Sequence, residues 1–303
     1  MKPGIRSSLS VFLEEALAPM NAVGEGRAML ETFGAEADAY GEAILSPNGR
    51  VAGFMIRGEG AEFTERAAAV LAAMQLPEAA RAHHRRLAHL MGHRRGFLKL
   101  EWHHREGQEP ERLAAFYHRR RPEVWRVLEF FDELGVAESV RGEIELLART
   151  LEKETVHFVA AAARAGQPGL HHKLYFSQYV TPDRLPGVTT RIGALMAPFG
   201  VSPEMVETWR PVHEAILGER ETTLFASINF TLAERKPWLK LDYPEVKPEV
   251  IQPWIAPQDQ ETARREMGHF IRTAGLRRMS YLGVRLSESP LPQLKYYADP
   301  RGA

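Results

Sequence analysis

Five hairpin signals follow one another along the chain at similar spacing. The first is the Asn-Gly pair within SPNG at residues 46–49, the strongest short signal for a two-residue hairpin turn. Four more turns rich in Gly or Pro lie near residues 108, 167, 235 and 289, so turns recur about every 55 to 70 residues. Strand-like runs flank each turn. The predicted hairpins span residues 40–57, 97–119, 156–180, 223–244 and 279–298.

Segments with helical apolar spacing lie before and between the hairpins. The predicted helices cover residues 8–33, 62–74, 78–91, 122–134, 137–154, 188–199, 203–217 and 259–274. Ten antiparallel strands joined as hairpins, with helices between them, predict an α+β fold in which the sheet closes into a barrel and the helices lie outside. We expect residues 1–303 to form one such domain. Residues 113–119 could instead begin a helix, and a multi-helix scaffold with incidental hairpins is the alternative.

The run GLHHKLYFSQ at residues 169–178 shows what the strands carry. Because side chains alternate along a strand, His171, Lys173, Tyr175 and Ser177 share a polar face, and the opposite face is mostly apolar. Lys followed two positions later by an acid or an aromatic residue recurs at positions 99/101, 240/242 and 295/297. In a barrel covered by helices, the apolar face meets the helices. The polar face therefore lines the lumen, and ten strands leave room there for a ligand.

The polar alternates define the predicted lumen. They are Tyr40, Glu42, Lys99, Glu101, His103, His171, Lys173, Tyr175, Ser227, Asn229, Trp238, Lys240, Asp242, Tyr281, Arg285, Lys295 and Tyr297, and Arg50 at the turn into the second strand could join them. Several ammonium groups in one chamber require a polyanionic ligand, because a buried charge without compensation costs several kcal/mol. A diphosphate fits that requirement, and rings beside it suit a developing carbocation through cation–π contacts.

Composition excludes several classes of function. Lys and Arg together number 39, as do Asp and Glu, so no overall charge points to nucleic acid. The absence of cysteine excludes disulfides, thiolate catalysis and cysteine-ligated metals. No apolar run is long enough to cross a membrane, and the first residues lack the apolar segment of a secretory signal. We therefore expect a cytoplasmic protein with no nucleic-acid or membrane partner, either a monomer or a homodimer.

Three segments carry a more specific likeness: HFVAAAARAGQPGLHHKLYF at 157–176, FASINFTLAERKPWLKLDYPEV at 225–246 and YLGVRLSESPLPQLKYYADP at 281–300. With the ordered hairpins, they resemble the aromatic prenyltransferases of the ABBA fold, and above all the dimethylallyltryptophan synthase-like branch. The last two are similar to that family's penultimate and final hairpins in turn length and closing proline. The resemblance covers about residues 38–300 and implies transfer of a prenyl group, with dimethylallyl favoured, from its diphosphate to an indole or tryptophan-type acceptor.

The resemblance also implies roles for individual residues. The diphosphate would be held by Arg50, His171, Lys173, Lys240, Arg285 and Lys295. The allyl cation would be shielded by Tyr117, Tyr175, Tyr281 and Tyr297. Glu42 would accept the indole N–H and help to remove a proton, and Lys173 is the other predicted catalytic residue. Because the chain lacks an acidic cluster of the DDxxD type, we expect no obligatory metal and no other cofactor.

Two positions depart from the family pattern. Asp242 stands where a shield tyrosine is expected, and Ala115 stands before Tyr117 where the family has a lysine. Lys99 on the neighbouring strand could supply the missing charge. A phenolic acceptor competes with an indole, although Glu42 favours the indole because a carboxylate accepts its N–H. A barrel that binds a small molecule without turnover is the competing class.

Overall fold

The computed structural model describes residues 16–34, 41–46, 50–73, 78–92, 95–105, 107–119, 121–164, 170–232, 236–255 and 279–298. Within them, ten strands form one closed antiparallel barrel in the order β1-β10-β9-β8-β7-β6-β5-β4-β3-β2. The strands are β1 (Gly41–Leu45), β2 (Val51–Glu59), β3 (Arg95–His103), β4 (Glu111–His118), β5 (Phe158–Arg164), β6 (Leu170–Val180), β7 (Thr222–Thr231), β8 (Trp238–Val246), β9 (Met279–Arg285) and β10 (Gln293–Ala298). The predicted five hairpins and closed barrel are confirmed.

Each strand pairs with its neighbours in sequence, and the first and last strands close the barrel. Among the described residues, the closing contact runs from Ala43 opposite Ala298 to Leu45 opposite Tyr296. The second hairpin is confirmed as a strand pair, with Lys99 opposite Ala115 in the register of β3 and β4. Residues 113–119 therefore do not begin a helix.

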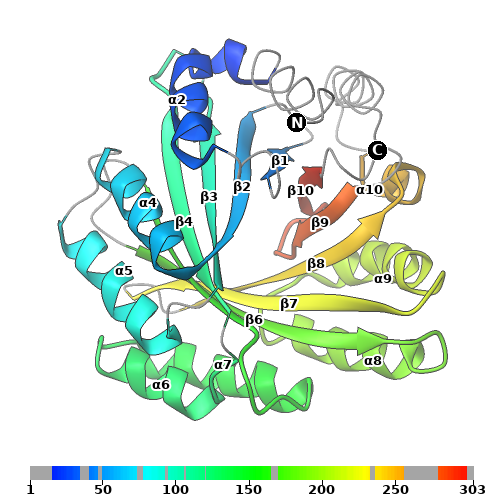
Figure 1. Ribbon diagram of the computed structural model, residues 1–303. Coiled ribbons are helices and arrows are strands. Elements are labelled where there is room, and N and C mark those ends of the chain that lie inside the picture. The colour runs from blue at the N-terminus through cyan, green and yellow to red at the C-terminus, as the bar shows by residue number, and fades with distance from the viewer. Residues whose placement is uncertain are drawn as a thin grey trace.

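Helices cover the outside of the barrel (Figure 1). They are η1 (Ala18–Met20), α2 (Val23–Phe33), α4 (Gly60–Ala73), α5 (Glu78–Met91), α6 (Val124–Asp132), α7 (Glu138–Thr150), α8 (Leu185–Met196), α9 (Pro203–Leu217), η2 (Pro248–Ile251) and α10 (Gln252–Ile255). Predicted bounds for α5 and α9 are confirmed, and α8 begins three residues earlier than predicted. Ser202 caps α9 by accepting the Met205 N–H at 3.1 Å, and Pro203 follows it, as the Ser-Pro signal predicted. The predicted helix at 259–274 lies outside the described residues.

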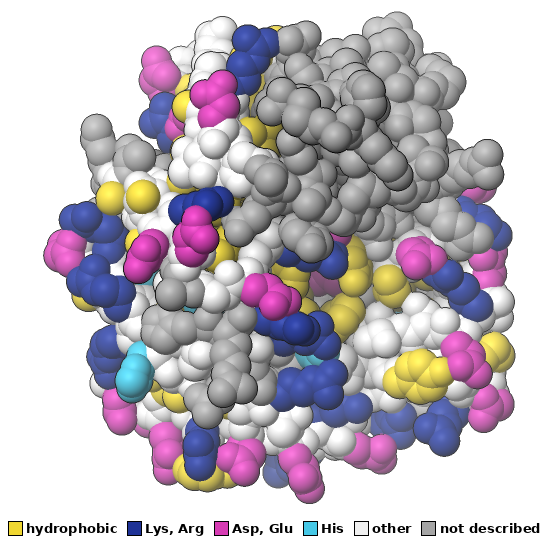
Figure 2. Space-filling view, viewed as in Figure 1, with side chains coloured by type: hydrophobic (Ala, Val, Ile, Leu, Met, Phe, Trp, Pro, Cys, Tyr) yellow, Lys and Arg dark blue, Asp and Glu magenta, His cyan; other side chains and the backbone are white. Residues whose placement is uncertain are grey.

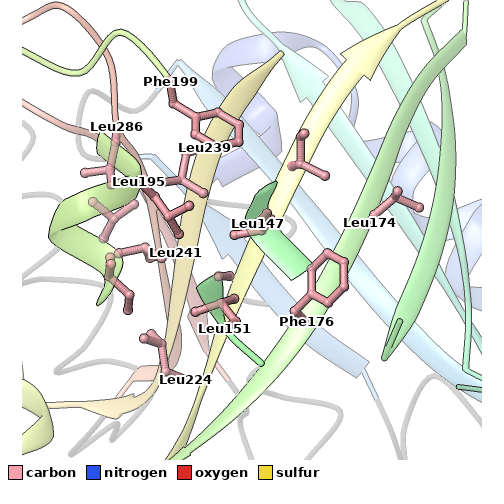
Figure 3. Close-up of a cluster of buried hydrophobic side chains, with 14 of the residues drawn as sticks. Leu147, Leu151, Leu174, Phe176, Leu195, Phe199, Leu224, Leu239, Leu241 and Leu286 are labelled. Atoms are coloured by element: carbon pink, nitrogen blue, oxygen red, sulfur yellow. The ribbon is translucent and has the colours of Figure 1, made fainter. Parts of the chain in front are cut away.

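The hydrophobic core is the layer between the helices and the outer face of the barrel. In Figure 3, Leu147 of α7, Leu151 just after this helix and Leu195 of α8 lie beside outward-facing side chains of the barrel. These are Leu174 and Phe176 of β6, Leu224 of β7, and Leu239 and Leu241 of β8. Leu174 and Phe176, the apolar alternates of the 169–178 run, are fully buried in this layer. Because the apolar side chains of each strand are buried against the helices, the polar side chains on the opposite face point into the barrel, as the sequence predicted.

Candidate active site

The barrel encloses two spaces stacked along its axis. A cavity of about 840 Å³ lies toward the hairpin turns, and we call it the polar chamber. Its polar lining residues are Ser46, Lys99, Glu101, His103, Arg164, His171, Lys173, Trp238, Lys240, Arg285, Ser289, Gln293 and Lys295. A second space of about 90 Å³ lies toward the opposite ends of the strands, and we call it the aromatic chamber. It is lined by Met55, Arg57, Phe97, Tyr117, Phe158, Tyr175, Phe225, Asp242, Tyr281 and Tyr297.

A two-residue step along a strand leads from one chamber to the other. Lys173 lines the polar chamber, and Tyr175 lines the aromatic chamber. The same step joins Lys295 to Tyr297 on β10 and Lys240 to Asp242 on β8. Residues two apart on one strand face are separated by about 7 Å. The repeated Lys-x-Tyr pattern thus places a ring of cations directly beside a ring of aromatic side chains.

Glu101 organises one side of the polar chamber. Its carboxylate lies 2.7 Å from the Nζ atoms of both Lys99 and Lys295 and 3.2 Å from His103 Nε2. Burial acts to raise the pKa of Glu101, but Lys295 and Lys99 hold it well below its usual value. Burial acts to lower the pKa of Lys99, but Glu101 holds it well above its usual value. Burial lowers the pKa of Lys295 to about 8 despite Glu101.

Lys173 is the least compensated cation of the polar chamber. Its Nζ donates to the Tyr117 hydroxyl at 3.3 Å and lies 5.8 Å from the centre of that ring. Among the described residues, no carboxylate lies within ion-pair distance of it. Burial, followed by the charges of Lys99 and Lys295, lowers its pKa well below the usual range. An anion in this chamber would therefore stabilise the ammonium form of Lys173.

Four tyrosines surround the junction of the two chambers: Tyr117, Tyr175, Tyr281 and Tyr297. The rings of Tyr117 and Tyr175 lie 5.9 Å apart, and the Lys240 Nζ lies 5.5 Å from the centre of the Tyr297 ring. Burial raises the pKa of each of the four hydroxyls. The phenols therefore stay neutral and offer their ring faces to a cation.

The far wall of the aromatic chamber was missed by the alternation argument. Phe97, Phe158 and Phe225 face inward, with Phe158 lying 5.3 Å from Phe97 and 5.9 Å from Phe225 between ring centres. Apolar residues were assigned to the outer face, although Phe97 and Phe225 each lie two positions from a predicted lumen residue on the same strand face. Phe158 had no such signal, because β5 carries alanines on both faces. Figure 2 shows a recess at the centre of the barrel with hydrophobic side chains in its wall and Lys and Arg side chains gathered beside it.

Glu42 faces the lumen from β1 but is covered. Its carboxylate accepts a hydrogen bond from Arg57 at 2.5 Å, and only 1% of the residue is exposed. Arg57 itself lines the aromatic chamber and lies over the Phe97 ring at 5.4 Å. The pair therefore closes one side of this chamber, with the arginine nearer to the space.

The structure brings most of the predicted site residues together. His171, Lys173, Lys240, Arg285 and Lys295 line the polar chamber. Arg285 stacks on Trp238, with its guanidinium carbon 4.3 Å from the ring centre. Arg50 is exposed at the end of the first turn and is not among the residues that line either chamber. Tyr40 lies outside the described residues.

Comparison of the sequence with models of protein families and with curated proteins finds no match. Solved structures match over nearly the whole chain. The prenyltransferase PriB, in a ternary complex with L-tryptophan and dimethylallyl thiolodiphosphate, aligns with a TM-score of 0.63 at 14% identity, covering 98% of this chain and 96% of that one.

The chain has the prenyltransferase barrel fold. A 5-dimethylallyl tryptophan synthase from Streptomyces coelicolor, in complex with DMASPP and Trp, aligns with a TM-score of 0.61 at 14% identity over 98% of this chain and 95% of that one. The NotF prenyltransferase aligns with a TM-score of 0.59 at 10% identity, over 87% and 80% of the two chains. The fold implied by the sequence resemblance is thereby confirmed.

The described residues contain neither a candidate metal site nor a candidate membrane span. No group of three or more His, Cys, Asp or Glu side chains in this part of the chain could hold a metal ion. No described helix has the length and apolar character that a membrane span requires.

Proposed function

We propose that the protein is an aromatic prenyltransferase that moves a prenyl group from its diphosphate to an indole or tryptophan-type acceptor, with dimethylallyl as the favoured group. The observation that carries the proposal is the two-residue step that sets lysines in one chamber and tyrosines in the next. Ionisation of an allylic diphosphate needs both at once, because negative charge grows on the leaving oxygens while positive charge grows on the prenyl carbons. Solved structures of this fold that hold tryptophan and a dimethylallyl diphosphate analogue support it.

The polar chamber is the proposed diphosphate site. Lys173, Lys240, Lys295, Arg285 and His171 converge there from β6, β8, β9 and β10. Charge-assisted hydrogen bonds from these groups would stabilise the phosphate oxygens as the C–O bond breaks and its electron pair leaves with the diphosphate. Protein cations thus supply the charge that a metal ion would otherwise bring, so we propose metal-independent turnover.

The aromatic chamber is the proposed site of bond formation. The prenyl cation would lie among the four tyrosines, whose rings stabilise it and keep out water that would capture it. The acceptor ring would lie against Phe97, Phe158 and Phe225, next to Arg57 and Glu42. Glu42 would accept a hydrogen bond from the indole N–H once Arg57 turns aside. This hydrogen bond favours an indole acceptor over a phenol.

Product formation tests the proposal. The purified protein is incubated with dimethylallyl or geranyl diphosphate and a panel of tryptophan, simple indoles and phenols, with EDTA present, and analysed by mass spectrometry. We expect a product heavier by one prenyl unit with an indole acceptor. Lys173→Ala and Glu42→Gln should each reduce its formation. Lys247→Ala is the matched control, since Lys247 lies outside the barrel in an ion pair with Glu219.

The competing functions give different results. Transfer to phenols alone would replace the indole acceptor with a phenolic one. Absence of product together with thermal stabilisation by dimethylallyl diphosphate would point to a binding barrel without turnover. Absence of both product and stabilisation would overturn the assignment of the polar chamber to a diphosphate.

A further inference from the structure

Asp242 occupies the junction between the two chambers. It lies on the inner face of β8, lines the aromatic chamber with Tyr175, Tyr281 and Tyr297, and is only 7% exposed. Burial is the main cause of the raised pKa of all four shield tyrosines, and the charge of Asp242 raises each of them further. The carboxylate therefore acts on all four tyrosines that would surround the prenyl cation.

The strand beside Asp242 makes room for this carboxylate. Gly283 lies opposite Asp242 in the register of β8 and β9. A Cβ atom at this position would lie 2.9 Å from Asp242 Oδ1 and 2.7 Å from the Cε atom of Lys240. These side chains would have to shift to admit such an atom, so the absence of a side chain at Gly283 leaves this space to the Lys240–Asp242 pair.

The two oxygens of Asp242 have different surroundings. Oδ1 accepts from Lys240 Nζ in an ion pair. Oδ2 is buried and has no hydrogen-bond partner among the described residues. Buried carboxylate oxygens are normally hydrogen-bonded, and one without a donor in the protein is free to meet a donor on a substrate. The lysine thus binds one oxygen of Asp242 and leaves Oδ2 available.

The other lumen carboxylates are less suited to meet a substrate. Glu42 is covered by Arg57, which holds its Oε1. Glu101 lies in the polar chamber and contacts Lys99, His103 and Lys295. Neither lines the aromatic chamber, whereas Asp242 does.

We propose that Asp242 is the general base that takes the ring proton after the acceptor has been alkylated. The inference rests on the proposed prenyl transfer. In the step, the C–O bond of the donor has already broken with its electron pair on the diphosphate, and a ring carbon has bonded to the prenyl C1. That ring carbon then gives its proton to Asp242 Oδ2, and the electrons of the C–H bond restore the aromatic ring. The proton leaves Asp242 to water when the chamber opens to release product.

The carboxylate lies beside the alkylated ring, which carries one positive charge, and stabilises it before it receives the proton. A tyrosine in its place would offer a ring face to the cation but no base to the ring, since its pKa is far above that of a carboxyl group.

The test separates proton removal from ionisation of the donor. Wild type and Asp242→Asn are assayed with an acceptor carrying deuterium at the position that is prenylated. We expect kcat to fall by about 10²-fold or more, in the range that a general base contributes. The deuterium isotope effect on kcat should rise from near one to above two. Release of diphosphate with prenyl alcohol should continue, because ionisation does not need the base.

Controls address folding and charge. Asp242→Asn leaves Lys240 buried without its partner, so the double variant Lys240→Gln/Asp242→Asn provides a neutral pair of similar size. It should show the same raised isotope effect, while Lys240→Gln alone should keep the effect near one. Asp183→Asn changes an exposed aspartate and should leave kcat unchanged.

The outcomes are distinct. If wild type yields no prenylated product with any acceptor, the proposed function and the role of Asp242 fall together. If wild type prenylates its acceptor and both Asp242 variants do so at a similar rate with an isotope effect near one, only the role of Asp242 is overturned. Loss of donor ionisation together with transfer would also overturn it, because the carboxylate would then act on the cation alone.

Discussion

At the scale of single residues, Lys173 lowers the stability of the empty protein but is available to bind a diphosphate. Its pKa is lowered well below the usual range, first by burial and then by Lys99 and Lys295. A buried cation without a carboxylate partner destabilises the empty protein, since removal from water is not offset by an ion pair. The same lack of compensation leaves its N–H groups available to a diphosphate.

Lys173→Met should therefore change stability and binding in opposite directions. The apolar side chain fills similar space, so we expect the free energy of unfolding of the empty protein to rise by about 1 kcal/mol. Affinity for inorganic diphosphate should fall about tenfold or more, as expected for loss of a charge-assisted hydrogen bond. Urea denaturation and calorimetric titration measure the two effects. If Lys173→Met is less stable than wild type, the lysine is compensated in the empty barrel and our reading of its environment is wrong.

The residue scale also shows where sequence reasoning stopped. Lys173, Lys240 and Lys295 were predictable because a lysine on one face of a strand is visible in the alternation. Phe97 was open to the same argument, because it shares its strand face with Lys99, whereas Phe158 was not, because β5 carries alanines on both faces. The burial of Glu42 behind Arg57 depends on the geometry of a cross-strand neighbour, which a period of two does not specify.

At the scale of elements, α5 is held to the barrel through histidines as well as apolar residues. His83 Nε2 lies 2.8 Å from His172 Nε2 on the outer face of β6, so one ring nitrogen donates to the other. Burial lowers the pKa of His172 well below its usual value. His84 is buried beside Phe116, and neither of its ring nitrogens has a hydrogen-bond partner among the described residues. Burial lowers the pKa of His83 to about 4 and that of His84 to about 3.

These histidines should make the fold sensitive to acid. The unfolded chain takes up protons on them as pH falls through 6.5, whereas the folded state does not until about pH 4 or below. The unfolded state binds more protons in this window, so the free energy of unfolding falls as pH falls, by about 1.4 kcal/mol per pH unit for each histidine. His84→Leu should reduce the slope between pH 6 and 4.5 in urea denaturation. The exposed His89 on the same helix provides the control His89→Gln, whose slope should match wild type.

The strands also differ in how clearly their sequences show which face points into the lumen. β6 and β8 alternate polar and apolar side chains, and both were assigned the correct inner face. β5 reads FVAAAAR and gives no such signal, because its two faces carry side chains of similar polarity and size. The structure shows that Ala160 and Ala162 face the lumen beside Tyr117 and Tyr175. Their small size leaves room for the polar chamber, a consequence visible only once the register is known.

At the scale of the whole molecule, closure of the barrel could be predicted from the number and order of the hairpins, because ten strands with helices between them leave few other ways to bury their apolar faces. The register of the contact that closes it could not. In the described part of the chain this contact joins three residues of β1 to three of β10, and nothing in either sequence fixes which residues lie opposite each other. The division of the lumen into two chambers was equally hidden, since it depends on all ten strands at once.

The lysines of the polar chamber should make diphosphate binding depend on pH. Lys295, 28% of whose side chain is exposed to the chamber, has a pKa lowered to about 8 by burial. The unfolded chain holds this proton to about pH 10.5. Between pH 8 and 10.5 the unfolded state therefore binds more protons than the empty folded state, and this residue makes the free energy of unfolding rise with pH. A bound diphosphate favours the ammonium form and opposes that trend.

The difference in melting temperature between the diphosphate-bound and empty protein should therefore shrink as pH rises through about 8. Thermal denaturation at pH 7 and pH 9.5, with and without inorganic diphosphate, measures it, and Lys295→Met should flatten the dependence while Lys247→Met should not. Calorimetric titration near pH 8.5 in two buffers of different ionisation enthalpy should show proton uptake on binding. Equal stabilisation at both pH values, with no proton uptake, would mean that the diphosphate does not reach the lysines of the polar chamber. The lysines of the polar chamber would then have a role other than binding the prenyl diphosphate.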